Sequence, residues 1–187
     1  ILKYEVPLIQ HSISAFARTF DVPQESPPFT LIVSSKRHNM CMFKANIKQD
    51  ADDATQNLSA GTVIDRDVTD PRYTEFYLQS HAAVRGSART VKFTLLHDGC
   101  NYKLAPLEHI TYGLSHSHQI VNSSTSIPTP AYVAGEYAER GMAVYSEFMA
   151  LPDSQGIQKD DLGALNDLLS YTQLDTSSHF KNARVNA

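Results

Sequence analysis

The hydrophobic residues of this chain follow two spacings, one typical of strands and one typical of helices. Short runs rich in β-branched and aromatic residues, bounded by turn residues, predict strands. These runs cover residues 29–35, 40–46, 61–65, 74–80 and 90–97. The KRHN sequence between the first two predicts a turn, and the polar segment 49–60 predicts an exposed loop.

Apolar residues three or four positions apart predict the helices. The first covers residues 2–20, with Pro7 close enough to its start to be tolerated. Two more are predicted over 105–121 and 130–150, and Pro130 suits the first turn of the latter. Because strands come first and helices last, the order of elements favours an α+β or an incomplete α/β domain.

Length and hydropathy indicate the domain organisation. The chain has 187 residues, enough for one domain with its own core and a short appendage. We predict a domain over residues 1–150 and a polar tail over 151–187 with one short helix at 160–171. No apolar run approaches the roughly 20 residues of a membrane span. The chain does not begin with Met, and it opens directly into the helical pattern, so we expect it to be cut from a longer protein.

Positive charge is unevenly distributed, although the formal net charge is −4. Two stretches, residues 31–49 and 81–97, contain cations and no acid. Their notable cations are Lys36, Arg37, Arg85, Arg89 and Lys92. A cluster of this kind is typical of polyanion binding, but the 16 cations of a small domain also cluster by chance. Charge alone leaves both interpretations open.

Neither the cysteines nor the histidines predict a metal centre. Cys41 and Cys100 form no CxxC pair, which favours a reducing compartment and argues against structural zinc. His109, His116 and His118 are close in sequence, but no Cys or acid stands at a spacing that completes a zinc site. Packed or surface histidines are the favoured interpretation.

Three aspartates, Asp65, Asp67 and Asp70, lie close together between a Gly and a Pro. In a strand Asp65 and Asp67 would point to the same face, which metal binding would favour. Two-metal nucleases instead gather carboxylates from separate strands and a helix. Three acids on one segment that ends in Asp-Pro therefore favour a strand end and a turn, where Asp accepts hydrogen bonds from local backbone donors.

A basic pattern follows the fourth predicted strand. His81, Arg85 and Arg89 fall at four-residue steps in a segment of small residues that turns at Gly86. This spacing lets cations and backbone N–H groups face one extended anion, such as a sugar-phosphate backbone. The Ser/Thr-rich turn 123–129, before a helix N-terminus, can add phosphate donors. The alternative is a solvated connection whose charges pair with nearby acids.

Five motifs of the chain resemble the C-terminal half of Argonaute PIWI domains. In order they are KRHNMCMF, AGTVIDRDVTDP, FYLQSHAAVRGSAR, ITYGLSHSHQIV and STSIPTPAYVAGEYAERG. The resemblance runs from residue 1 to about 145 and looks closest to the worm-specific Argonautes that carry secondary small interfering RNAs. It implies an α/β class with a partial RNase H-like (PIWI) fold, in which helices flank a mixed sheet and the upstream strands precede Ile1.

The resemblance also implies that the chain has no slicer site. Slicing members of the family hold magnesium with two Asp, one Glu and a final His or Asp. Asp65 and Asp67 precede FYLQSHA, where the family has no metal ligand, and the other carboxylates would lie before residue 1. The final ligand falls at Gly135, which has no side chain. We therefore expect no catalytic residue, no bound metal and no cofactor.

Binding of guide-strand phosphates is the role that the resemblance leaves in place. The residues that match family positions for this role are Lys36, Arg37, His81, Arg85, Arg89, Ser126, Tyr132 and Arg140, with the terminal carboxylate of Ala187 reaching toward the 5′-phosphate pocket. Cys41, His118 and Ile120 depart from the pattern, because other Argonautes carry Arg, Tyr and Arg there. These departures lower the expected strength of phosphate binding but do not change the expected location of the site.

The sequence therefore predicts sequence-independent binding of the phosphate backbone and 5′ end of a small guide RNA in RNA-mediated gene silencing, without slicer activity. The other partners would be a target RNA paired with the guide and silencing proteins of unknown identity. The location would be intracellular, in the cytoplasm or nucleus, with no membrane partner.

Two alternatives stay open. One is a metal-dependent RNase H-like endonuclease (slicer) using Asp65, Asp67 and a histidine, and the other is a truncated fragment acting only as a protein-interaction scaffold.

Overall fold

The computed structural model describes residues 2–20, 27–45 and 53–149. It divides into two compact units, residues 1–129 and 130–187, and each is described by itself. The predicted tail helix at 160–171 lies outside the described residues, and the predicted domain boundary at residue 150 stays a prediction.

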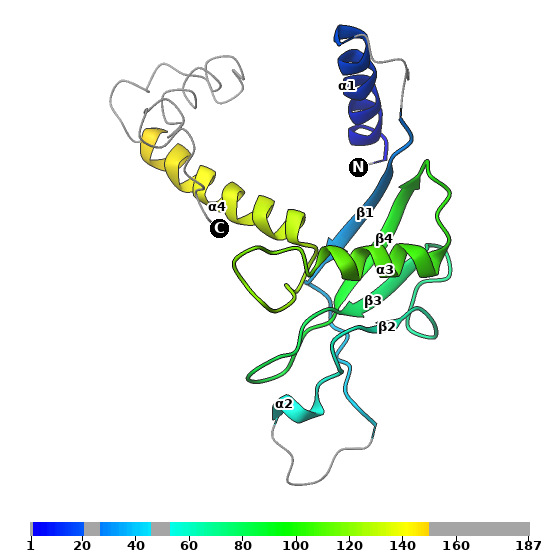
Figure 1. The fold of residues 1–187 in the computed structure, drawn as a ribbon, viewed down its shortest axis with the longest axis vertical. Coiled ribbons are helices and arrows are strands. Elements are labelled where there is room, and N and C mark those ends of the chain that lie inside the picture. Colours follow the sequence, from blue (N-terminus) through cyan, green and yellow to red (C-terminus); the bar gives the residue numbers. More distant parts are fainter. Residues whose placement is uncertain (1, 21–26, 46–52, 150–187) are drawn as a thin grey trace. The chain divides into compact units, whose positions relative to one another are not determined.

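The first unit contains a four-stranded sheet (Figure 1). Its strands are β1 (Thr30–Ser35), β2 (Thr62–Ile64), β3 (Glu75–Gln79) and β4 (Val91–Asp98), in the spatial order β1-β4-β3-β2. Every pairing among these described strands is antiparallel. Four of the five predicted strands are thereby confirmed, as is the α/β class.

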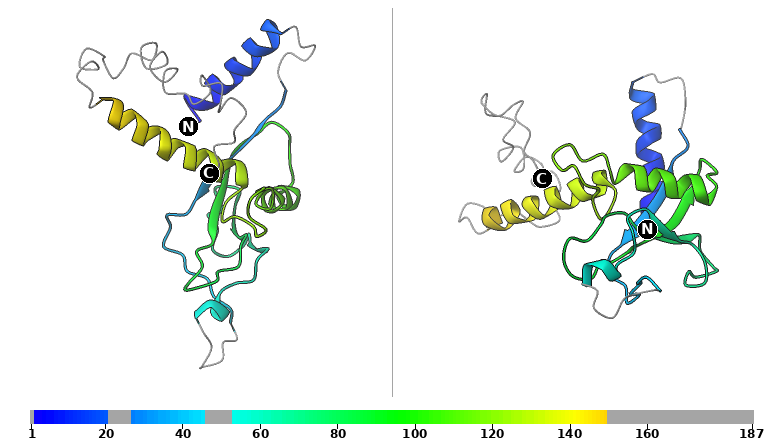
Figure 2. Two further views of the ribbon diagram at one scale, coloured as in Figure 1. Left: turned by 60° about the vertical axis from the view of Figure 1, so that its left-hand side comes forward. Right: turned by 60° about the horizontal axis from the view of Figure 1, so that its bottom comes forward.

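The core lies between the two central strands and helix α3 (Leu104–Leu114), which lies across one face of the sheet (Figures 1 and 2). Phe76 of β3 is directly opposite Phe93 of β4, and their rings stack with centroids 5.1 Å apart. Strand alternation places Leu78 and Val91 on this same face, where Leu107 of α3 joins the cluster. Burial of this apolar face holds the helix on the sheet.

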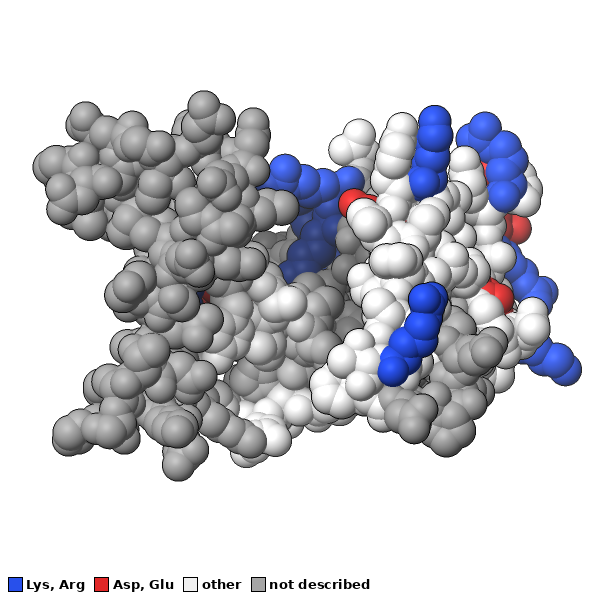
Figure 3. Space-filling model, turned by 90° about the horizontal axis from the view of Figure 1, so that it is seen from above, with Lys and Arg blue, Asp and Glu red and all other residues white. Residues whose placement is uncertain are grey.

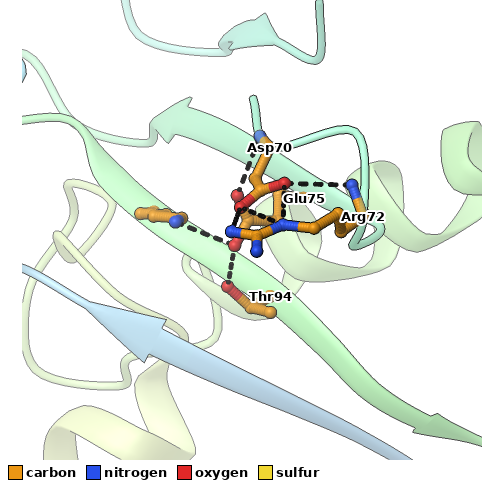
Figure 4. A network of polar contacts seen from close by, with 5 residues as sticks. Asp70, Arg72, Glu75 and Thr94 are labelled. Carbon is orange, nitrogen blue, oxygen red and sulfur yellow. Dashed lines mark hydrogen bonds and ion pairs between the residues drawn. The ribbon is translucent and has the colours of Figure 1, made fainter. Parts of the chain in front are cut away.

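The opposite face of β3 and β4 carries a polar network (Figure 4). The Glu75 carboxylate, almost fully buried, accepts hydrogen bonds from Lys92 Nζ and Thr94 Oγ1, each at 2.8 Å. The backbone N–H of Asp70 donates to its second oxygen at 3.3 Å. Burial alone raises the pKa of Glu75, but these hydrogen bonds outweigh it and hold the pKa below its ordinary value.

Replacing Glu75 by glutamine is expected to lower the free energy of unfolding at pH 7 by about 1–3 kcal/mol, because the amide leaves the half-buried Lys92 ammonium without its counter-charge. Since the pKa of Glu75 is lowered by folding, its contribution is present above the ordinary Glu pKa of about 4.3 and is lost as the pH falls through the folded value. Urea unfolding of both chains from pH 7 downward should show the difference shrinking below about pH 4.3. A difference that is constant or grows on acidification would contradict this account.

Two further helices match their predictions. Helix α1 (Glu5–Thr19) has Pro7 in its first turn, and helix α4 (Thr129–Met149), which extends into the second unit, has Pro130 in its first turn. No helix in the described ranges has the length and apolar character needed to cross a membrane.

The predicted strand at 40–46 is wrong for the residues that the structure describes. Residues 40–45 show only one isolated bridge, between Phe43 and Asn57, and most of their side chains are exposed. Strand-like composition therefore does not by itself pair a segment with the sheet. The neighbouring loop predicted at 49–60 contains one short helix, α2 (Asp53–Gln56), in its described part.

The second predicted helix, 105–121, ends early. Helix α3 stops at Leu114, and His116 and His118 follow it in a turn. The hydrogen bonds change at this point. The N–H groups of Ser115 and His116 donate to the carbonyls three residues back, and the Ser115 carbonyl accepts from the N–H of Thr125 instead of from a following helical residue.

Candidate nucleic-acid interface

A basic cavity of about 520 Å³ opens on the first unit where three chain segments meet. One segment follows β1, one joins β3 to β4, and one is the turn after α3. The residues that line it are Lys36, His81, Ala82, Ala83, Val84, Arg85, Ser87, Ala88, Arg89 and Ser126. Five of the residues predicted to bind phosphate are therefore brought together around one cavity.

The place of Lys36 is set by the end of β1. The strand ends at Ser35, so Lys36 is the first residue of the KRHN turn. Two positions later, His38 Nε2 donates to the Thr90 carbonyl at 2.7 Å, and the ring packs edge-on against Tyr77. These contacts fasten the turn beside the start of β4, where the basic loop rejoins the sheet.

The loop of residues 81–90, which joins β3 to β4, is held from its middle by Asn57. This buried side chain donates to the Gly86 carbonyl and accepts from the Ala88 N–H, both at 2.8 Å. Gly86 has φ +69°, a left-handed conformation that glycine adopts without strain. Arg85 and Arg89 thus flank a fixed segment and both extend from it into the cavity lining.

Ser126 is positioned by hydroxyl groups. Ser80 Oγ donates to the Thr125 carbonyl, and Ser124 Oγ donates to the Ser80 carbonyl, each at 2.6 Å. This pair of hydrogen bonds ties the end of β3 to the turn 122–128, so Ser126 lies beside His81 at the cavity. Hydroxyl groups therefore attach this Ser/Thr-rich turn to the end of β3, and Ser126 lines the cavity.

The cavity is positively charged. No Asp or Glu stands among its described lining residues, and the described ion pairs involve none of Lys36, Arg85 and Arg89. On the one face of the molecule drawn in Figure 3, Lys and Arg side chains project from the described surface and small areas of Asp and Glu lie near them. Burial, with a smaller contribution from the charge of Lys36, lowers the pKa of His81. His81 is thus a neutral hydrogen-bonding group at pH 7.

The family model of the Piwi domain matches residues 1–146. This chain belongs to the Piwi domain family. Two curated relatives are Argonaute protein wago-1 and Argonaute protein wago-4 of Caenorhabditis elegans, 34% and 32% identical over 98% and 100% of this chain. The chain spans about a fifth of their length, 19% and 21%. The resemblance to Argonaute PIWI domains is confirmed.

Solved structures agree with this placement of the Piwi-family chain. The C-terminal lobe of a budding yeast Argonaute is similar over 83% of the chain, with a TM-score of 0.73 at 24% identity, and the chain covers 32% of it. Kluyveromyces polysporus Argonaute with a guide RNA is similar over 81%, with a TM-score of 0.69 at 25% identity, and the chain covers 18% of it. The partial RNase H-like fold is confirmed.

Four predicted phosphate-binding residues of this Piwi-family chain are not part of the cavity lining. Arg37 is exposed next to Lys36. Tyr132 and Arg140 lie on α4, in the second unit, where the Arg140 guanidinium lies 5.9 Å from the centre of the Tyr137 ring. Ala187 is outside the described residues. Their roles stay predictions.

The three clustered aspartates form a turn. β2 ends at Ile64, so Asp65 and Asp67 do not continue a strand, and Asp67 has φ +65°. The Asp70 carboxylate accepts from the Arg72 backbone N–H at 3.0 Å and from its guanidinium at 2.7 Å (Figure 4). These hydrogen bonds lower the pKa of Asp70 to about 2. In residues 2–20, 27–45 and 53–149, no three His, Cys, Asp or Glu side chains gather to hold a metal ion.

The histidines of the α3 region bond to the backbone. His109 Nδ1 donates to the Ala105 carbonyl at 2.7 Å, and His116 Nδ1 donates to the Tyr112 carbonyl at 3.0 Å. His118 Nδ1 accepts from the N–H of Ile120. These bonds use Nδ1 and leave Nε2 of each ring, but among the residues that the structure describes no three His, Cys, Asp or Glu side chains gather to hold a metal ion.

Sequence reasoning missed the residues that hold the cavity in shape. Asn57 makes two hydrogen bonds to the basic loop and His38 makes one to its end, yet neither residue belongs to a periodic pattern or a binding motif. The small residues Ala82, Ala83 and Ala88 of the lining carried a weaker signal, because a run of small side chains lets an anion approach the backbone.

Proposed function

We propose that this chain binds the sugar-phosphate backbone of a small guide RNA, independently of base sequence, and does not cut RNA. The observation that supports this most strongly is the basic cavity, where Lys36, Arg85 and Arg89 from two separate segments share one opening with no described carboxylate. A cavity with this composition attracts anions. Within the described residues, none of its three cations has to give up an ion pair to bind one.

The donor types suit phosphodiesters. The guanidinium groups of Arg85 and Arg89 can each bind two phosphate oxygens through parallel N–H donors, whereas Lys36 acts as a point charge. Ser126 and the neutral His81 offer uncharged donors between these cations. Contacts to phosphates fix the position of a nucleic acid without reading its bases.

The similarity to an Argonaute solved with a guide RNA supports RNA as the ligand. In this proposal the guide would select a target RNA by base pairing, and silencing would depend on recruited proteins. Such partners place the activity inside the cell, in the cytoplasm or the nucleus. Tyr132, Arg140 and Ala187 would add contacts at the 5′ phosphate, as the family resemblance implies.

The proposal of a non-cutting chain is supported by the residues available. The resemblance puts the last metal ligand at Gly135, which offers no donor atom, and Asp70 is engaged by Arg72. The clustered acids therefore do not fit a two-metal site, which needs several ligands converging from separate elements. No magnesium or other cofactor is part of the proposed function.

Binding should depend steeply on salt. We expect the chain to bind a fluorescent 5′-phosphorylated short RNA, with log Kd changing by about 0.7 per phosphate contact for each unit of log salt concentration, or about 2 for the three cations. Fluorescence anisotropy over a salt series measures this slope. An uncharged peptide nucleic acid of the same base sequence is the matched control and should not bind. Equal binding of both ligands would show that phosphate recognition is not the basis of affinity.

Cleavage is not expected. A labelled target RNA paired with a bound guide should stay intact in Mg²⁺ or Mn²⁺, because no set of described carboxylates converges on a metal. Denaturing gel electrophoresis after a long incubation checks this. Guide-programmed cutting that disappears in Asp65→Asn would instead support the nuclease alternative.

A further inference from the structure

Ser87 lies in the middle of the basic loop and has a role in none of the contacts above. It is exposed and lines the cavity, two residues after Arg85 and two before Arg89, which line it as well. In the described part of the chain its hydroxyl makes no hydrogen bond. The side chain is therefore available for chemistry at the mouth of the cavity.

The backbone on both sides of Ser87 is fixed. Asn57 binds the Gly86 carbonyl and the Ala88 N–H, both at 2.8 Å, so the peptide units before and after Ser87 are held by one buried side chain. A group attached to Ser87 Oγ would consequently stay at the cavity. A freely moving loop would let it leave.

The surroundings favour a phosphate at this position. A phosphoserine carries about −1.5 to −2 charges at pH 7 and three strong acceptor oxygens. Within the same lining it would meet Lys36, Arg85 and Arg89 and no described acid. Its oxygens would occupy the donors that an RNA phosphate needs, and its charge would repel the rest of the RNA backbone.

We propose that Ser87 is a phosphorylation site and that its phosphate competes with RNA for the basic cavity. This inference rests on the proposed function. The reaction is transfer from a nucleoside triphosphate by an arginine-directed serine kinase. Ser87 Oγ bonds to the γ-phosphorus, the bond from that phosphorus to the β–γ bridging oxygen breaks, and the nucleoside diphosphate leaves. The hydroxyl proton passes to the base of the kinase.

The competition is mutual. RNA in the cavity covers Ser87, so the kinase modifies the unloaded chain, and the phosphorylated chain then no longer takes up RNA. In this way the modification would select between empty and loaded protein without any change of fold.

The test compares three forms of the 187-residue chain: unmodified, with phosphoserine incorporated at Ser87, and with phosphoserine incorporated at Ser12 as a charge-matched control. Ser12 is exposed on α1 and does not line the cavity. Binding of the fluorescent 5′-phosphorylated RNA should be equal for the unmodified and Ser12 forms. It should be at least about tenfold weaker for the Ser87 form at low salt, with the salt slope reduced by about 1.4 as two contacts are lost.

Two readouts are independent of RNA affinity. In ³¹P NMR titrations the second phosphate pKa should be about 6 at Ser12 and lower at Ser87, because the cavity cations favour the dianion. Kinase and labelled ATP should modify the wild-type chain and not Ser87→Ala, and excess RNA should slow the reaction.

The outcomes separate the two proposals. If the unmodified and Ser12 forms do not bind RNA, the proposed function is wrong and the competition fails with it. If they bind and the Ser87 form binds equally, or titrates like Ser12, only the Ser87 inference is overturned. Labelling that is absent in the wild-type chain, or retained in Ser87→Ala, overturns it as well.

Discussion

Replacing Arg85 and Arg89 together by glutamine is expected to weaken binding of a 5′-phosphorylated short RNA by about 100-fold at low salt. Each arginine lines the same cavity, and a hydrogen bond to a charged group contributes about 1.5–3 kcal/mol, or roughly tenfold or more in Kd. The lower end applies because both side chains are exposed and screened by solvent. The salt slope should fall by about 1.4, since two phosphate contacts are removed.

A single-charge control for this double variant is Arg66→Gln. Arg66 is exposed and lies in the acidic turn, outside the cavity, so its replacement removes the same kind of charge without removing a lining group. Its Kd and salt slope should stay within about twofold of the wild-type values. If Arg66→Gln weakened binding as much as the double variant, net charge rather than the cavity would explain the affinity. A double variant with unchanged affinity would exclude the cavity as the RNA site.

A third variant, Arg140→Gln, addresses the 5′-phosphate contact that the family resemblance implies for this arginine. It should weaken binding of a 5′-phosphorylated short RNA. An RNA with a 5′ hydroxyl in place of the 5′ phosphate is the matching ligand control. The effect of Arg140 should disappear with that ligand if its contact is to the 5′ phosphate.

Local parts of this molecule could be predicted from the sequence, and contacts between distant segments could not. The strands around Phe76 and Phe93 were predictable because alternation places their apolar side chains on one face. Arg85 and Arg89 share one loop, so their spacing alone indicated a basic surface. Composition also indicates the turn 123–129 as a source of phosphate donors, whereas Lys36 and Ser126 are individually assigned to phosphate binding by the family resemblance. Their convergence depends on the sheet order, which places the end of β1 beside β4.

The errors have similar causes. The segment 40–46 has strand-like composition, but its described part makes only one isolated bridge, because a strand also depends on pairing with a distant segment, which composition does not report. The predicted extension of α3 to residue 121 followed local spacing, which does not report that the N–H of Thr125 donates to the Ser115 carbonyl. Asn57 was missed because a lone Asn in a loop has no periodic signature, although it holds the loop of the candidate site.

Phe76→Ala is expected to have the largest effect on stability, lowering the free energy of unfolding by about 3–5 kcal/mol. Phe76 has 0% of its surface exposed and stacks on Phe93 between the sheet and α3, so its removal leaves a cavity that neighbouring strands cannot close. For a chain of this size the melting temperature should fall by roughly 2–4 °C for each kcal/mol, about 10 °C in total. Thermal and urea unfolding followed by circular dichroism measure both quantities.

Val121→Ala is the control for this core variant, since Val121 is 47% exposed and does not line the cavity, and its change should leave the melting temperature within about 1 °C. The comparison also tests whether the chain folds alone. The basic loop begins at the end of β3 and ends at the start of β4, so RNA binding requires the sheet that Phe76 stabilises. Below its own melting temperature Phe76→Ala should therefore bind RNA with nearly wild-type affinity, and above that temperature binding should be lost together with the dichroic signal. A wild-type chain without a cooperative transition would support the truncated-scaffold alternative, because an unfolded loop would not bring Lys36 and Ser126 to one cavity.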